Sequence, residues 1–224
     1  MEQEKSYERV IQHIKDEILC GNLRQGQKLP PERELAEQLK VGRNSVREAL
    51  RTLDILGIIS STQGAGNYMT CNFEKSLVES MSMMFLMNRT NYRQISELRQ
   101  GIETQAAMLA CDRITESQLC RVEQLIQELS GDHPEERNVA LDKQFHYLIA
   151  QASQNQLIVE ILQALSSVMD AFISDLRRDI LAREGRRELL MEAHAGMARG
   201  LRLRDRALLE ASLREHFRLI EENL

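Results

Sequence analysis

Apolar residues recur every three or four positions over most of this chain, which is the period of an amphipathic α-helix. The first pattern runs from Tyr7 to about Cys20, where Gly21 would end the helix as a glycine C-cap. Two shorter patterns follow, from Pro31 to about Leu39 and from Arg43 to Leu56, and Val41-Gly42 makes the turn between them. The sequence therefore predicts three helices, of which the last two are joined by a tight turn.

After these helices the pattern changes twice. Residues 57–62 and 67–71 are short β-like runs on either side of the turn Gln63-Gly64-Ala65-Gly66, and they predict a β-hairpin. Beyond Asn72 the helical period returns, and we expect a mainly α fold with two domains, residues 1–72 and residues 73–224, the second an all-α helical bundle. The helices predicted there are Glu74–Met87, Tyr92–Arg113, Glu116–Leu129, Glu136–Ala152, Gln156–Arg177, Arg186–Leu201 and Arg206–Asn223.

The composition agrees with a globular, largely helical protein. The 224 residues include only three prolines and eleven glycines, and 42% are hydrophobic. No apolar run approaches the roughly 20 residues that span a bilayer, and the polar, acidic N-terminus does not resemble a signal peptide. The four cysteines form no CxxC pair, which is typical of reduced thiols. We therefore expect a cytoplasmic protein without a membrane segment.

The net charge of −5 is unevenly distributed along the chain. Acidic and basic side chains balance over residues 1–71, so all the excess acid lies in the later part. Lys40, Arg43, Arg47 and Arg51 cluster, and those inside the helix share one face. Such a stripe is either a solvated basic surface or a DNA-reading one. The preceding short helix, the turn and the hairpin favour DNA.

In a helix-turn-helix, the front of the second helix enters the major groove of DNA. Arginine there suits the O6 and N7 atoms of guanine, and a good bidentate contact contributes about 1–3 kcal/mol of discrimination. Arg43 and Arg47 are the candidates for this contact, while Asn44 and Ser45 could bind phosphates or base edges. Arg33, which begins the preceding helix, would hold phosphate or a neighbouring guanine. The sequence thus predicts double-stranded DNA as a partner.

Fixed spacings over the first sixty or so residues carry a family resemblance. They are Gly21-x-Leu23-x-x-Gly26-x-x-Leu29-Pro30, Glu32-Arg33-x-Leu35-Ala36, Val41-x-Arg43, Val46-Arg47-Glu48-Ala49-Leu50, Leu53 and Gly57. This pattern resembles the N-terminal winged helix-turn-helix domain of GntR-type bacterial transcription regulators, in which the β-hairpin is the wing. The resemblance implies a homodimer that reads a palindromic operator. It also implies DNA contacts at Arg33, Arg43, Arg47 and the wing glycines Gly64 and Gly66.

The chain departs from that family pattern at two places. Gly42 replaces the serine of the usual Val-Ser-Arg turn. The loss of this side-chain N-cap costs on the order of a few tenths of a kcal/mol if glycine takes the cap. Gln63 stands in the wing where the family usually has an arginine. Whether the wing contacts the minor groove therefore stays open.

Three histidines and a carboxylate lie on predicted apolar faces of the later helices. Asp142 and His146 stand one turn apart on one helix, and His194 and His216 each lie on the apolar stripe of another. A lone histidine of this kind is usually a hydrogen-bonded core residue, but three histidines with an aspartate favour a metal site. Imidazole nitrogens with a carboxylate suit a divalent metal ion, with zinc the first choice and nickel or manganese as alternatives. An octahedral ion would keep positions open for an organic acid.

Arg99 is a further inward polar residue, on a stripe with Ile95 and Ala106. A buried arginine needs an anion. Glu103, one turn along the same helix, is the candidate if the pair is purely structural. The alternative is that the guanidinium of Arg99 binds the carboxylate of a ligand through two hydrogen bonds.

These residues together resemble the all-helical ligand domain, named FCD, of the FadR subfamily of GntR regulators. The resemblance runs from about residue 73 to the end, and seven helices suit its larger, FadR-like branch. It implies a divalent metal bound inside the bundle and a small carboxylate effector held between the metal and Arg99. Members that bind acyl-CoA lack the metal set, which argues against that ligand. The matching positions are Arg99-x-x-x-Glu103, Asp142-x-x-x-His146, Asn155, His194 and His216, with Asp142 and the three histidines as the metal ligands.

The sequence thus predicts a ligand-responsive DNA-binding regulator of a metabolic operon, a repressor in preference to an activator, and not an enzyme. Two alternatives stay open at this point. The metal site could be purely structural, or the chain could be a metal-dependent hydrolase carrying a DNA-binding head. The hydrolase would use Glu103 or Glu192 as its general base, but the sequence holds no HExxH-like motif.

Overall fold

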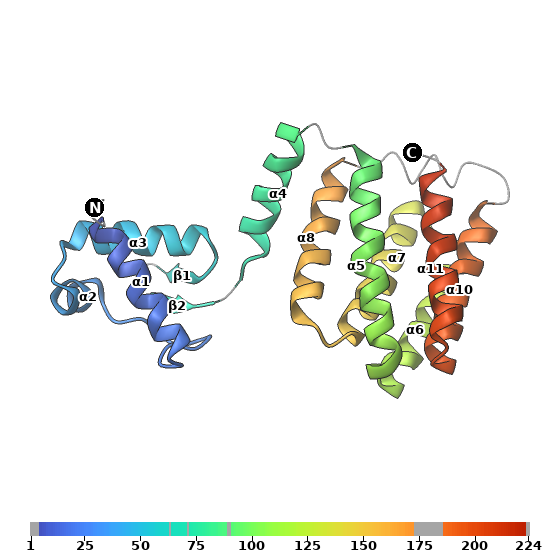
Figure 1. Ribbon diagram of the computed structural model, residues 1–224, viewed down its shortest axis with the longest axis horizontal. Helices are drawn as coiled ribbons and strands as arrows, with labels where there is room; N and C mark the ends of the chain where they lie inside the picture. Colours follow the sequence, from blue (N-terminus) through green and yellow to red (C-terminus); the bar gives the residue numbers. More distant parts are fainter. Residues whose placement is uncertain (1–4, 63, 71, 89–90, 173–185, 223–224) are drawn as a thin grey trace. The chain divides into compact units, whose positions relative to one another are not determined.

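In the computed structural model the chain forms two compact units, Met1–Glu79 and Ser80–Leu224. The structure describes residues 5–222 except 63, 71, 89–90 and 173–185. Helices make up most of both units, and a two-stranded hairpin follows the first three helices (Figure 1). The expected mainly α fold is confirmed.

The first unit contains a winged helix-turn-helix. Its elements are α1 (Ser6–Leu19), α2 (Glu32–Leu39), α3 (Arg43–Ile55), β1 (Ile59–Thr62) and β2 (Gly66–Met69). The two strands are antiparallel, with Ile59 opposite Met69 and Thr62 opposite Gly66. The apolar faces of the three helices pack on the inner side of the hairpin and form one core. Its buried residues are Val10, Ile14, Leu29, Leu35, Ala36, Val46, Ala49, Leu50, Leu53, Ile59 and Met69.

Backbone geometry explains two glycines at the ends of α3. Gly42, with φ −69° and ψ 147°, occupies the N-cap position of α3. No side chain caps the helix there, because glycine stands where the family usually has a serine. Gly57 follows the helix with φ +73°, and a Cβ atom there would lie 1.8 Å from the carbonyl oxygen of Asn72. The amide of Asn72 donates to the carbonyl oxygen of Gly57 at 2.7 Å. This contact fixes the end of the hairpin against the end of α3, so position 57 accepts only glycine.

In the second unit the helices from α5 onward that the structure describes stand side by side as a bundle, and α4 precedes them (Figure 1). The predicted helix ends agree with the observed ones to within a few residues. The predicted continuations of two helices, to Arg177 and to Asn223, lie outside the described residues. The helices are α4 (Glu74–Asn88), which crosses the division between the units, α5 (Tyr92–Arg113), α6 (Glu116–Leu129), α7 (Glu135–Ala152), α8 (Gln156–Phe172), α10 (Arg186–Leu203) and α11 (Arg206–Glu221).

Capping residues next to the first turn define where several of these helices begin, and the apolar faces of the helices pack together. Asn91 with Gln94 and Thr115 with Gln118 form capping boxes at the starts of α5 and α6. Helices α5, α6, α7, α10 and α11 enclose the core, in which Phe145 on α7 and Phe217 on α11 are fully buried. Apolar packing thus brings α7, α10 and α11 together.

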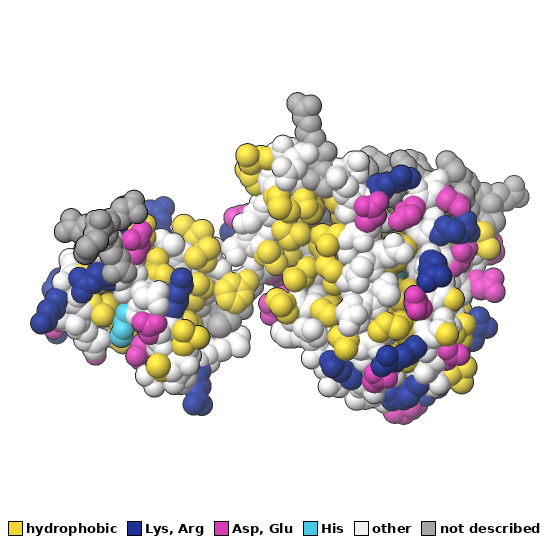
Figure 2. All heavy atoms as spheres, in the orientation of Figure 1, with side chains coloured by type: hydrophobic (Ala, Val, Ile, Leu, Met, Phe, Trp, Pro, Cys, Tyr) yellow, Lys and Arg dark blue, Asp and Glu magenta, His cyan; other side chains and the backbone are white. Residues whose placement is uncertain are grey.

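On the face of the second unit that Figure 2 shows, Lys and Arg side chains lie among Asp and Glu side chains. Over the described residues, no helix combines the length and the apolar character needed to cross a membrane.

Candidate functional site

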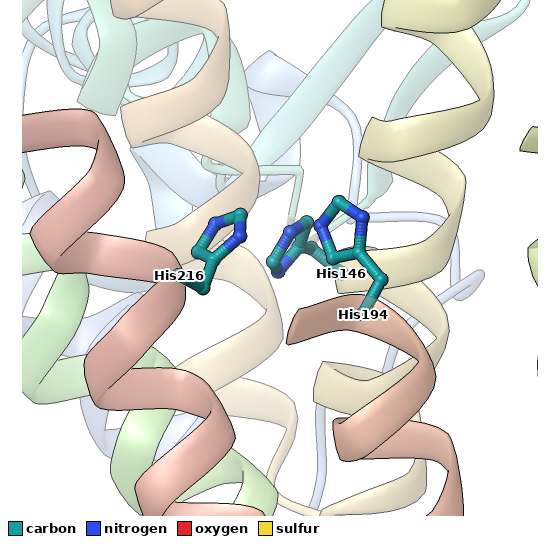
Figure 3. A group of neighbouring side chains, drawn as sticks. All are labelled: His146, His194 and His216. Carbon is teal, nitrogen blue, oxygen red and sulfur yellow. The ribbon is translucent and has the colours of Figure 1, made fainter. Parts of the chain in front are cut away.

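Three histidines from three helices meet inside the second unit (Figure 3). His146 lies on α7, His194 on α10 and His216 on α11, and the last two are only 1% and 3% exposed. One ligand nitrogen from each ring lies within 4.8 Å of the other two. The ring centroid of His216 is 4.7 Å from that of His146 and 4.8 Å from that of His194. The structure therefore brings together the three histidines that sequence analysis singled out.

Asp142 lies at the edge of this cluster. It precedes His146 by one turn of α7, and its Oδ1 is 3.4 Å from Nε2 of His194. Nε2 of His146 and Nδ1 of His216 are buried and have no hydrogen-bonding partner among the described residues. Buried imidazole nitrogens beside a carboxylate are the donor set that zinc, nickel and manganese bind. These residues therefore fit a divalent metal ion.

A second group of polar side chains adjoins the histidines. Nε and Nη2 of Arg99 lie 2.8 Å and 2.6 Å from Oε1 of Glu103, one turn further along α5. The other carboxylate oxygen of Glu103, Oε2, is 2.8 Å from Nδ1 of His146. Glu103 is only 5% exposed. Glu103 is therefore the partner of Arg99 in this structure, as expected if the pair is purely structural.

The electrostatics of this group keep Glu103 ionised. Burial alone would raise the pKa of Glu103, but the Arg99 guanidinium and His146 outweigh it and hold that pKa well below its usual range. Burial lowers the pKa of His216 well below its usual value, and His146 and His194 lower it further. For His146, burial acts in the same direction, but the Glu103 carboxylate outweighs it and raises the pKa. Of these imidazoles, His216 is thus held in the neutral form that binds metal ions.

A small cavity adjoins the same residues. Its volume is about 10 Å³, which is about the space that one water molecule needs. An organic acid would therefore enter this cavity only if side chains moved. The cavity is lined by Glu103, Ala106, His146, Ile149, Ala150, Leu162 and Leu213.

The predicted DNA-reading residues lie on the surface of the first unit. Nη2 of Arg47 is 3.2 Å from Oε2 of Glu32, and Nε of Arg33 is 3.7 Å from Oε1 of Glu37. Exposed ion pairs of this kind contribute little, so either arginine can exchange its glutamate for DNA. Two of the predicted DNA-contacting residues, Ser45 and Gly66, are partly buried. The others are exposed: Arg33, Arg43, Asn44, Arg47 and Gly64.

Sequence reasoning missed two features of these sites. It placed Glu103 beside Arg99 but not against His146, because spacing along one helix says nothing about contacts with another. It also missed exposed Lys28, which forms a β-bridge with Tyr68 of β2. A Cβ atom on Gly66 would lie 2.9 Å from Cε of Lys28, so this lysine brings a positive charge to the wing, where Gln63 replaces the usual arginine.

Both parts of the chain match known protein families. Residues 6–69 match the gntR family of bacterial regulatory proteins, and residues 94–219 match the FCD domain. The HTH-type transcriptional regulator LutR of Bacillus subtilis is 29% identical, over 92% of this chain and 95% of that protein. The Glc operon transcriptional activator of Escherichia coli is 26% identical, over 96% of this chain and 87% of that protein.

A solved structure shares the fold. Streptococcus agalactiae GntR superposes with a TM-score of 0.68 at 24% identity, and the match covers 97% of this chain and 100% of that one. The FCD match alone spans more than half of the present chain. The chain therefore belongs to the GntR family of bacterial transcriptional regulators and carries an FCD domain in its second part.

Proposed function

We propose that this regulator represses a metabolic operon by binding a palindromic operator as a homodimer, and that a small carboxylate bound at a metal centre changes its affinity for the operator. In this proposal residues 1–72 bind DNA, and residues 73–224 bind the metal and the effector. The observation that carries it is the buried group of His146, His194 and His216 beside Asp142. Buried polar atoms normally have hydrogen-bonding partners, so Nε2 of His146 and Nδ1 of His216, which have none among the described residues, call for a ligand.

The DNA-binding part of the proposal rests on α3. Its apolar residues are buried in the core of the first unit, so the opposite face, with Arg43 and Arg47, is free for the major groove. These two arginines would read guanines. Asn44 and Ser45 at the start of α3, Arg33 on α2 and the backbone at Gly64 and Gly66 would hold phosphates and base edges.

The metal centre would use Asp142, His146, His194 and His216. When bound, a divalent ion supplies positive charge and open coordination positions for an organic acid. The burial of His194 and His216 excludes water, and the lowered pKa of His216 keeps its ring ready to donate a lone pair. We propose zinc first, with nickel or manganese as alternatives.

The effector would be a small organic acid held by the metal and by Arg99. Nε and Nη2 of Arg99 contact Glu103, so the ligand carboxylate would accept hydrogen bonds from the N–H groups of the guanidinium that Glu103 does not use. The adjoining cavity of about 10 Å³ would have to open for any organic acid, and compact acids such as lactate, glycolate and pyruvate would need the smallest opening. Citrate and sugar acids would require a larger opening of the bundle.

Dimerisation is supported by the apolar surface of α4. Met83, Met84, Leu86 and Met87 are 58%, 47%, 59% and 77% exposed, and hydrophobic side chains gather along this helix (Figure 2). A contiguous exposed apolar patch marks an interaction surface, and a second copy of the chain would cover it. The effector can then change operator affinity only as far as it binds the two states of the dimer differently.

Elemental mass spectrometry on the untagged protein tests the metal centre. We expect about one zinc, nickel or manganese ion per chain in the wild type and its loss in His194→Ala. His13→Ala is the matched control, because His13 lies on α1 in the other unit. An absence of metal from the wild type would return the three histidines to the role of core residues and would leave DNA binding untouched.

Operator binding tests the regulatory part. A binding sequence is first selected from random duplexes, and its affinity is then measured with L-lactate, glycolate, pyruvate or citrate. We expect at least one acid to change the affinity of the wild type. A metal-loaded protein that is indifferent to every acid would show that its metal site is structural.

A further inference from the structure

The carboxylate of Glu103 lies between a proposed effector-binding residue and a proposed metal ligand. Oε1 contacts Arg99 on the same helix, at 2.8 Å from Nε and 2.6 Å from Nη2. Oε2 contacts Nδ1 of His146 on α7 at 2.8 Å. The side chains of Arg99, Glu103 and His146 are 18%, 6% and 10% exposed, so water has little access to these contacts.

Neutralising the positive charge of Arg99 would not by itself require Glu103 to contact His146 as well. One carboxylate oxygen takes both nitrogens of the guanidinium, and the second oxygen is used for a histidine from another helix. Oε2 accepts no hydrogen bond from any other described residue, so a hydrogen on Nδ1 of His146 would be donated to it across 2.8 Å. The other ring nitrogen, Nε2, is buried and has no hydrogen-bonding partner among the described residues. With the proton on Nδ1, Nε2 would keep the lone pair that a metal ion binds.

We propose that Glu103, anchored by Arg99, is a positioning residue that sets the tautomer and the orientation of His146 for metal binding. This inference rests on the proposed metal centre. A metal-ligating histidine commonly donates its second N–H to a carboxylate, which fixes the ring and raises the basicity of the ligating nitrogen. Here the same carboxylate also holds Arg99, so the residue proposed to bind the effector is one contact away from a metal ligand.

Glu103→Gln is the informative substitution because it keeps the size of the side chain. A carboxylate has two accepting oxygens, whereas an amide has one. The glutamine therefore cannot accept hydrogen bonds from both Arg99 and His146 in the present geometry. Glu97→Gln is the matched control, since Glu97 lies on the same helix and is exposed.

The first test titrates Co(II) into the metal-free full-length protein and follows its visible absorption. We expect Glu103→Gln to weaken Co(II) binding by about 10–100-fold, and Glu97→Gln to leave it unchanged. In a His146→Ala background, Glu103→Gln should cause no further loss, because the residue through which Glu103 acts is gone. An equal loss in both backgrounds would indicate a merely structural role and would overturn the proposal.

The second test needs no change at Glu103 and so does not depend on the folding of that variant. Long-range proton–nitrogen NMR on the zinc-loaded wild type reports which ring nitrogen of His146 carries the proton, with the signal assigned by its absence in His146→Gln. We expect the proton on Nδ1. A proton on Nε2, with zinc on Nδ1, would overturn the inference and leave the metal centre standing. A wild-type protein that binds neither Co(II) nor zinc would overturn the metal centre itself, and the inference with it.

Discussion

Gly200 tests whether α10 and α11 must approach as closely as the structure has them, because these helices carry His194 and His216. A Cβ atom added at Gly200 would lie 2.9 Å from the backbone N, the Cα and the Cβ of Leu209 on α11. Contacts this short involve backbone atoms, so the two helices would have to separate. We therefore expect Gly200→Ala to destabilise the second unit and to weaken metal binding at the cluster.

The matched substitution is Gly101→Ala on α5. Gly101 is exposed, and a Cβ atom there meets nothing within 4 Å. Replacing glycine by alanine inside a helix stabilises it by about 1 kcal/mol, and this gain is common to both sites. Overpacking at Gly200 costs about 1–3 kcal/mol. The two variants should therefore differ by about 1–3 kcal/mol, with Gly101→Ala more stable than the wild type.

Urea unfolding followed by circular dichroism at 222 nm, in the presence of a chelator, measures this difference. Both substitutions lie in the second unit, so the first unit contributes equally to the two curves. In a thermal scan the same difference should appear as a separation of roughly 2–12 °C, from about 2–4 °C per kcal/mol for a domain of this size. Equal midpoints would refute the reasoning, because they would show that the helices accommodate the extra methyl group without cost.

Four further predictions follow from individual residues. Arg47→Ala should weaken operator binding by about 1–3 kcal/mol per copy in a gel-shift assay and leave metal content unchanged; loss of both would count against separate functions for the two units. Lys28→Ala should lower the slope of log affinity against log salt by about 1, if this lysine contacts a phosphate from the wing. Free zinc at 100 times its dissociation constant should stabilise the protein by about 2.7 kcal/mol, and EDTA should reverse the rise in melting temperature. Burial raises the pKa of the Cys111 thiol, so a maleimide should label it only in denaturant, whereas it should label exposed Cys120 in the native protein.

The sequence determined the local structure of this protein. The helices that the structure describes, the turn before Arg43 and the hairpin after Gly57 were predicted, because helix periodicity, caps and glycine positions act over a few neighbouring residues. The same periodicity put His194 and His216 on buried faces. It also paired Arg99 with Glu103, because residues four apart on a helix are neighbours.

Only the tertiary structure decided which buried faces meet. A helical stripe shows that His146 points inward, but the register of α7 against α5 decides that Glu103 is its neighbour. Likewise, the close approach of α10 to α11 at Gly200 depends on how side chains from distant segments fill the core. Periodicity fixes the direction of a side chain around its own helix axis, whereas the distance between two side chains on different helices depends on the packing of the whole bundle.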